Sequence, residues 1–222
     1  MAHFTKDFTA FFKDLAANND REWFHANKKR YEKSVKGPFK NFVQEMIDRI
    51  AKEDPQVKLE PKDAIFRIAR DTRFSKDKTP YKMHMSAIIS PNGRKDHSTP
   101  GVYIQLGAED VRFYGGAYAP DKDQLYTMRE YITKNLKEFD KVISEKSFKQ
   151  AFGEIHGEKN KRIPKEFMDA AEKQPLLYNK GWYYFVKLKP SLIAKDELCD
   201  VLMEHYHVSK PIKEFFTKAL GN

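Results

Sequence analysis

The amino-acid sequence predicts an α+β fold, in which a mainly antiparallel sheet of about five strands has helices N- and C-terminal to it. Apolar residues recur at helical spacing through residues 1–52, alternate with polar residues over 63–118, and return to helical spacing in 121–222. One further segment of strand character lies near 182–188. We therefore expect a single α+β domain, residues 1–222, made of N-terminal helices, a sheet core, and a helical half with one returning strand.

The N-terminal part of the chain is predicted to form three helices. Residues 4–16 place phenylalanines on one face of a helix. Asn19 and Glu22 resemble a capping box at the start of the second helix, and Pro38 suits the first position of a third, where we expect the chain to restart. Residues 39–50 carry the clearest apolar stripe in the sequence, so we expect this helix to pack on the sheet.

The middle of the chain shows the two-residue period of half-buried strands. The apolar sets are Phe66 and Ile68; Met83, Met85, Ala87 and Ile89; Val102, Ile104 and Leu106; and Val111 and Phe113. The short connection over 107–110 predicts a hairpin between the last two. On the opposite faces lie Arg67, His84, Tyr103, Arg112, Tyr183 and Lys187. Such a mixture of cations and aromatic rings suits an anionic, partly planar ligand, unless helices cover this face as well.

The C-terminal half is predicted to be helical apart from the returning strand. A helix begins at Asp121, and further helices fit residues 137–150 and 164–172. Two closing helices fit residues 196–205 and 209–220.

The composition narrows the classes of protein to which the chain can belong. It has seventeen Phe and eleven Tyr, enough for a substantial core, and no apolar run near the ~18–20 residues that span a bilayer. We expect no membrane association, no signal peptide and a cytoplasmic location. With Cys199 as the only cysteine, we expect no disulfide and no cysteine-based zinc site. The net charge of +9 favours a polyanionic partner or simply a solvated, lysine-rich surface.

The strongest functional signal is the run F-R-I-A-R-D-T-R-F-S-K-D-K-T-P-Y from Phe66 to Tyr81. Five cationic side chains in and beside it are the predicted anion ligands: Arg67, Arg70, Arg73, Lys78 and Lys82. Guanidinium groups bind carboxylates and phosphates through two parallel hydrogen bonds, which suits a compact anion site. The alternative is an internal ion-pair network, in which Asp71 binds Arg70 or Arg73 and fixes the loop.

A second polar-aromatic segment lies on the predicted second helix, where three residues share one face. The candidate pocket-lining residues are Trp23, Asn27 and Tyr31, together with Tyr103 and Arg112. The alternative is a helix that packs against the protein by its polar edge, which gives the same pattern. His84 is the one weak candidate for a catalytic acid or base, and a structural histidine is the alternative. We predict no metal site and no cofactor, since a solvated helix end accounts for His205 and His207.

These motifs resemble the family called domain of unknown function 2461. The similarity lies in N-N-D-R-E-W-F from Asn18, F-R-I-A-R-D-T-R-F-S-K-D-K-T-P-Y-K from Phe66, G-V-Y-I-Q-L from Gly101, and G-G-A-Y-A-P from Gly115. The resemblance covers nearly the whole chain. It implies an intracellular single-domain protein, and it brings no established activity, cofactor or catalytic residue.

Three functional hypotheses follow from the sequence. We favour binding of a phosphorylated small molecule or nucleotide through the Arg/Lys cluster. The alternatives are a nucleic-acid-binding module that uses the basic surface, and a structural or interaction protein with an internal ion-pair network. The sequence leaves open whether the protein is an enzyme and whether it forms oligomers.

Overall fold

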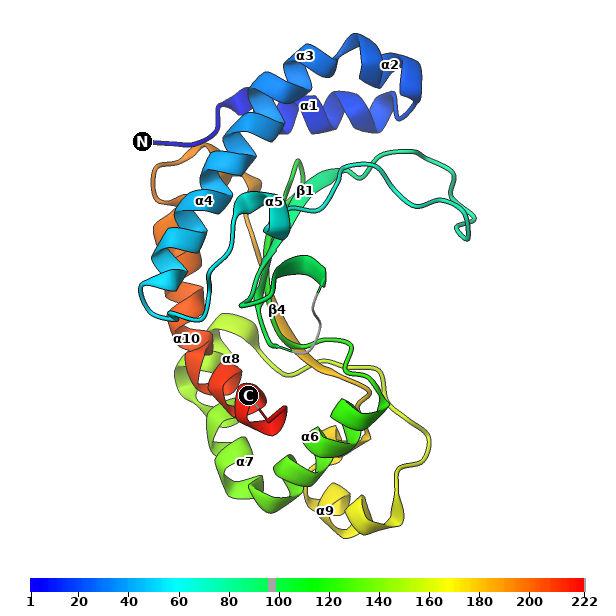
Figure 1. Ribbon diagram of the computed structural model, residues 1–222, viewed down its shortest axis with the longest axis vertical. Coiled ribbons are helices and arrows are strands. Elements are labelled where there is room, and N and C mark those ends of the chain that lie inside the picture. The colour runs from blue at the N-terminus through cyan, green and yellow to red at the C-terminus, as the bar shows by residue number, and fades with distance from the viewer. Residues whose placement is uncertain (96–98, 222) are drawn as a thin grey trace. The chain divides into compact units, whose positions relative to one another are not determined.

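The computed structural model describes residues 1–95 and 99–221, and it has an α+β architecture with helices on both sides of an antiparallel sheet (Figure 1). The chain forms two compact units. The first consists of residues 1–94, 103–113 and 187–203, and the second of residues 95–102, 114–186 and 204–222. The assignment of a single domain therefore stays a prediction.

The sheet has four strands among the described residues, in the order β1-β2-β3-β4. They are β1 (His84–Ile89), β2 (Val102–Gly107), β3 (Val111–Ala117) and β4 (Trp182–Leu188). The predicted hairpin is present, because the Gly107 N–H donates to the carbonyl of Asp110 where β2 turns into β3. Burial alternates along β2 and β3 as the two-residue period requires, with one face buried and the other half-buried.

The predicted strand over Phe66 and Ile68 does not form, which is why the sheet has four strands and not five. Isolated antiparallel bridges join Ile65 to Ala87 and Ala69 to Tyr81. The pairing register changes by two residues between these bridges, as at a bulge, so no continuous ladder forms. Ile68 is buried as predicted, whereas Phe66 is half-buried and its ring lies 6.0 Å from that of Tyr103.

The N-terminal helices belong to the first unit, and two local expectations about them were wrong. The elements are α1 (Lys6–Ala17), α2 (Arg21–Ala26), α3 (Lys28–Tyr31), the π-helical turn η1 (Glu32–Lys36), α4 (Gly37–Ala51) and α5 (Pro61–Ala64). Asp20, not Asn19, caps α2 by accepting from the Trp23 N–H at 2.8 Å. Pro38 does lie in the first turn of α4, as predicted, but the chain does not restart there: η1 runs directly into α4 and changes the hydrogen-bond pattern where proline removes a donor.

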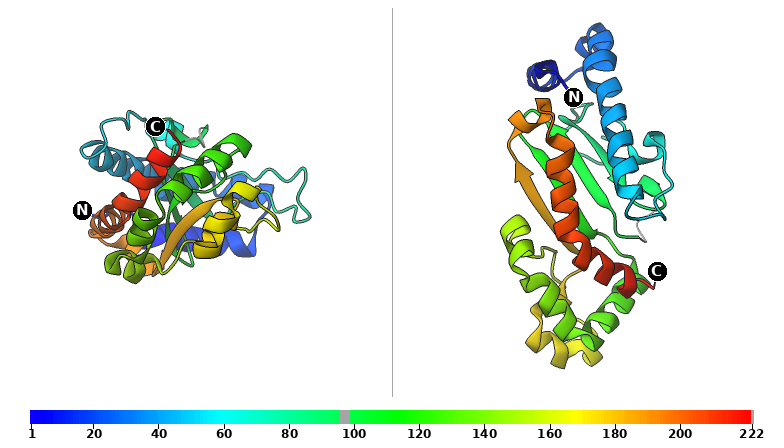
Figure 2. Two further views of the ribbon diagram at one scale, coloured as in Figure 1. Left: turned by 90° about the horizontal axis from the view of Figure 1, so that it is seen from below. Right: turned by 90° about the vertical axis from the view of Figure 1, so that its left-hand side faces the viewer.

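Helix α4 carries the predicted apolar stripe, and all six members are buried: Phe39, Phe42, Val43, Met46, Ile47 and Ile50. It packs against β1 and α5, so this helix forms the core of the first unit together with the sheet. The segment between α5 and β1 extends away from β1 as a long loop (Figure 1; Figure 2, left). This loop carries the cationic run.

The remaining helices differ from the predictions at two places. They are α6 (Lys122–Lys134), α7 (Leu136–Ser144), α8 (Lys146–Phe152), α9 (Met168–Lys173) and α10 (Leu198–Ala219), with short helical turns η2 (Gly93–Lys95), η3 (Lys165–Phe167), η4 (Pro175–Tyr178) and η5 (Pro190–Ala194). The single helix predicted over 137–150 is divided by Glu145, whose backbone is extended. The two predicted closing helices are one, since Pro211 is accommodated inside α10.

Candidate anion-binding site

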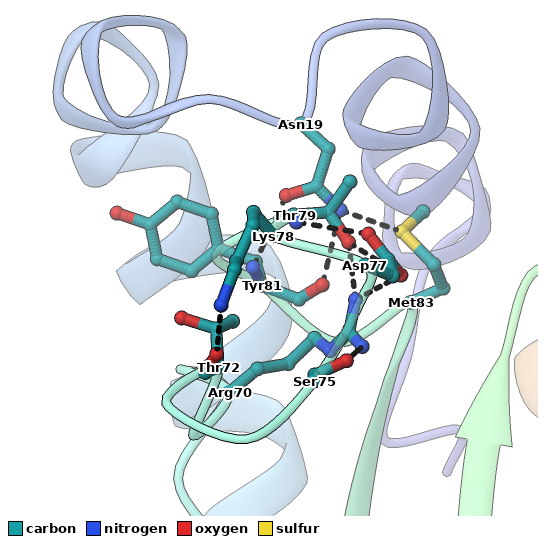
Figure 3. A network of polar contacts seen from close by, with 9 residues as sticks. All are labelled: Asn19, Arg70, Thr72, Ser75, Asp77, Lys78, Thr79, Tyr81 and Met83. Carbon is teal, nitrogen blue, oxygen red and sulfur yellow. Dashed lines mark hydrogen bonds and ion pairs between the residues drawn. The ribbon is translucent and has the colours of Figure 1, made fainter.

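The cationic loop, residues 66–82, is anchored at its C-terminal end by Asn19 (Figure 3). The Asn19 amide donates to the Tyr81 carbonyl at 3.0 Å and accepts from the Tyr81 N–H at 3.1 Å. The ring of Phe24 in α2 stacks on that of Tyr81, with centroids 4.0 Å apart. Both polar groups of the Tyr81 backbone are thus bound by one side chain, and the Phe24 ring places α2 next to the end of the loop.

The prediction that Asn19 caps the second helix was wrong, because Asp20 is the cap. The signal that could have identified its role is the pair Asn19-Asp20, since only one of two adjacent side chains can cap α2 and the other is free to bind elsewhere. The partner was beyond local reasoning, because Asn19 and Tyr81 are 62 residues apart in the sequence.

The hydrogen-bond and ion-pair partners of the Arg70 guanidinium lie inside the cationic loop. Its guanidinium forms an ion pair with Asp77, donates to the hydroxyl of Thr79, and lies 3.5 Å from that of Ser75 (Figure 3). Asp77 also accepts from the Thr79 N–H at 2.9 Å. This backbone hydrogen bond, followed by that of Arg70, lowers the pKa of Asp77 to about 2. These bonds close the loop on itself.

Arg73 and Lys78 also have partners within the loop. Arg73 pairs with Asp71 at 2.7 Å between Nη2 and Oδ2, and this hydrogen bond lowers the pKa of Asp71. The Lys78 ammonium donates to the carbonyl of Thr72 at 2.9 Å. Arg73 therefore pairs with Asp71 as the network hypothesis describes, whereas the carboxylate that binds Arg70 is Asp77 and not Asp71.

Arg67 and Lys82 differ from these three cations. In the parts of the chain that the structure describes, neither side chain has a hydrogen bond or an ion pair. Arg67 is exposed, whereas Lys82 is half-buried with its Nζ 5.4 Å from the centre of the Phe66 ring. Burial, followed by the nearby charge of Arg67, lowers the pKa of Lys82. The structure thus brings a guanidinium and an ammonium together with no carboxylate bound to either.

His84, at the start of β1, extends this cationic environment. Its pKa is lowered to about 4, first by burial and then by the charges of Lys82 and Arg112, with a smaller opposing effect of Asp110. Arg112 in β3 donates to Asp110 at 2.7 Å, so its charge is partly compensated. At neutral pH His84 is an uncharged imidazole that can donate or accept a hydrogen bond.

Aromatic rings complete the surface around these groups. Phe66 contacts both the Lys82 ammonium and the ring of Tyr103, whose hydroxyl lies 3.4 Å from Gln105. We call the set the cationic face: Phe66, Arg67, Lys82, His84, Tyr103 and Arg112. All six belong to the first unit and all are at least partly accessible. They combine donors for an anion with rings on which a planar group can stack.

Comparison with known proteins identifies the family. The sequence model of a family described as "Conserved hypothetical protein (DUF2461)" matches residues 7–215. The chain belongs to the DUF2461 family. No curated protein and no solved structure matches it. The range matched by DUF2461 includes the cationic loop, the cationic face and Asn19, while the description assigns none of them a ligand or an activity.

The other candidate pocket residues of this DUF2461 protein lie in the N-terminal helices. Trp23 packs on Phe11 in α1, and the Asn27 amide donates to the Trp23 carbonyl at 2.9 Å. Tyr31 is buried and its hydroxyl lies 3.7 Å from the sulfur of Met85, so burial raises its pKa. These contacts belong to the packing of α1 to α3 on the start of the sheet. Among the described residues, none of the helices combines the length and apolar character that a bilayer crossing requires.

Proposed function

We propose that this DUF2461 protein binds a phosphorylated small molecule or a nucleotide on its cationic face. The observation that carries the proposal is Lys82, a half-buried ammonium without a hydrogen-bonded acceptor among the described residues. Burial of a charge is unfavourable unless the charge is paired. A phosphate group bound at Lys82 would supply the missing partner and would favour the charged form that burial now disfavours.

The neighbours of Lys82 indicate the class of ligand. Arg67 can offer a planar pair of N–H donors to the same phosphate, which a second lysine would not do. Phe66 and Tyr103 provide rings for stacking of a base or another planar group. Within this proposal, His84 is the group that would accept a proton if the bound molecule reacts.

A structural role is the second candidate, and a specific observation favours it for Arg70. This guanidinium is bound by Asp77 and Thr79 inside the loop, as expected of a residue that fixes the backbone. Arg70 and Arg73 are therefore not required as primary ligands. We propose that the loop network shapes the segment that presents Arg67 and Lys82.

Binding can be measured by thermal-shift titration with inorganic pyrophosphate, ATP and a single-stranded oligonucleotide. A ligand that binds only the folded state stabilises it by about 2.7 kcal/mol at one hundred times its Kd. Pyrophosphate or ATP should raise the midpoint of wild-type unfolding. Lys82→Met and Arg67→Gln should each weaken binding about tenfold or more, which corresponds to about 1.4 kcal/mol.

Matched control variants distinguish binding at a specific site from general electrostatic attraction. Lys58→Met and Arg21→Gln remove the same charges at exposed positions of the first unit, so they should leave the titrations unchanged. Equal loss in these controls would reveal non-specific attraction. If only the oligonucleotide binds, with affinity that falls steeply as salt rises, the protein is a nucleic-acid-binding module instead.

A further inference from the structure

Three side chains of the first unit that are distant in the sequence meet outside the cationic loop and the cationic face. They are His3 in the N-terminal segment, Glu45 in α4 and Cys199 in α10. One potential ligand atom from each lies within 4.8 Å of the other two. The closest pair is His3 Nε2 and Glu45 Oε2, which are 2.7 Å apart.

We propose that His3, Glu45 and Cys199 form a binding site for a divalent metal ion, with zinc as the best chemical match. Imidazole nitrogen, carboxylate oxygen and thiolate sulfur are the three donors that zinc accepts in proteins. Hard cations such as magnesium and calcium prefer oxygen ligands alone and do not fit this set. Three protein ligands leave one position of a tetrahedron for water, as in zinc sites that are not purely structural.

Neighbouring groups orient the ligand atoms. Arg49, one turn further along α4, binds Glu45 Oε1 at 2.6 Å and Asp200 at 2.5 Å. The other carboxylate oxygen of Glu45 is thereby directed at His3. The His3 ring packs edge-on against Phe42, with centroids 5.9 Å apart, and Cys199 is buried. Partners of this kind, which fix ligands in place, are typical of metal sites.

Metal binding at these residues requires modest changes that balance chemically. The Cys199 thiol loses its proton to solvent as the sulfur–metal bond forms. His3 Nε2 now donates a hydrogen bond to the Glu45 carboxylate, so it must also release its proton on coordination, either to Nδ1 as the neutral ring changes tautomer or to solvent from a charged ring. Glu45 remains a carboxylate, so a divalent ion with one thiolate and one carboxylate has no net charge. The sequence predicts no metal site, because Cys199 is the only cysteine and a solvated helix end accounts for His205 and His207. No local motif connects the three proposed ligands, since His3 and Glu45 are 42 residues apart and Cys199 is much further along the chain.

Cobalt(II) provides a direct test, because a cobalt–thiolate bond gives an intense charge-transfer absorption that surface histidines do not produce. The full, untagged chain is titrated with Co²⁺ and then with Zn²⁺. The expected result is one equivalent of Co²⁺ with this absorption, displaced by Zn²⁺ at one equivalent. Cys199→Ser should abolish the absorption, and His3→Ala should weaken Co²⁺ binding at least tenfold.

His25→Ala is the matched control, since His25 is an exposed histidine of α2 outside the cluster, and it should change neither stoichiometry nor spectrum. Circular dichroism checks that each variant is folded. Absence of a thiolate absorption in the folded wild type overturns the proposal. An absorption that survives in Cys199→Ser, or a His3→Ala variant that binds as well as His25→Ala does, overturns it equally.

Discussion

Arg67 and Arg70 are three positions apart in the sequence, yet their surroundings are opposite. Arg70 is held by a carboxylate and a hydroxyl of its own loop, whereas Arg67 is exposed and has no hydrogen bond or ion pair among the described residues. The difference arises because residues 70–80 fold back on themselves and enclose only the side chains that point into the turn. Charge count alone therefore overstates the number of cations that are free to bind a ligand.

At the residue scale, His84 gives a prediction for the dependence of stability on pH. Its pKa is lowered from 6.5 to about 4 in the folded protein. Between these values the unfolded chain binds the proton more tightly, so the free energy of unfolding falls as pH is lowered through this window. Below pH ~4 the loss is complete, and a shift of this size corresponds to about 3 kcal/mol.

Urea unfolding of wild type and His84→Gln across pH 4 to 7 checks this expectation. The variant should lose most of the slope between pH ~6.5 and ~4. His25→Gln serves as control, because the exposed histidine should leave the slope intact. An unchanged slope in His84→Gln would show that another group is responsible.

At the element scale, the cationic loop is fixed at two places, by Asn19 at Tyr81 and by Arg70 across its interior. Backbone bonds from the Arg70 N–H to the Pro80 carbonyl and from the Lys82 N–H to the Ile68 carbonyl join its two arms. The loop thus keeps a defined shape although many of its residues are exposed. This defined shape of the loop fixes the position of Lys82 relative to Phe66.

Arg70→Lys tests the internal role of Arg70, because lysine keeps the charge and loses the planar set of donors. We expect a loss of about 1 kcal/mol in the free energy of unfolding. Hydrogen exchange at the amides of Arg70 and Lys82 should also become faster. Arg73→Lys is the matched control, since the Arg73–Asp71 pair is exposed and should contribute little. Equal effects of the two substitutions would contradict an internal role specific to Arg70.

Helix α4 gives a prediction about the core of the first unit. Phe42 is fully buried, and its ring lies 5.6 Å from that of Phe4 and 5.8 Å from that of Phe39. Phe42→Ala should lower the free energy of unfolding by about 3–5 kcal/mol, since the cavity cannot fully collapse. Asn41→Ala, at an exposed position of the same helix, should change it by less than about 0.5 kcal/mol. A small loss for Phe42→Ala in chemical denaturation would mean that α4 is peripheral to the core.

At the scale of the whole molecule, the features that sequence could predict were those encoded by local periodicity. The spacing of apolar residues over a short stretch was enough to predict three features: the stripe of α4, the hairpin from β2 to β3 and the bounds of β4. Periodicity does not report hydrogen-bond register or packing. Three features that depend on them were therefore not predicted: the missing fifth strand, the π-helical turn before Pro38 and the continuous α10.

In the candidate site, too, local features could be predicted from the sequence and contacts between distant segments could not. The sequence indicated a cluster of cations, and the structure distinguishes Arg67 and Lys82 from those that have internal partners. The contact between Asn19 and Tyr81, and the meeting of His3 with Cys199, join segments that no local motif connects. The match to DUF2461 identifies the family but names no ligand, so the ligand must be found by experiment.

A crystal structure of the protein grown with pyrophosphate would show directly whether the cationic face binds an anion. We expect a phosphate oxygen within ~2.7–3.2 Å of Lys82 Nζ, with the Arg67 guanidinium on the same anion and Arg70 still bound to Asp77. Pyrophosphate held by Arg70 and Arg73, with no contact to Lys82, would show that the proposed site is wrong. So would a Lys82 ammonium paired with a carboxylate of the chain itself, or a cationic face without bound anion at a pyrophosphate concentration that saturates the thermal shift.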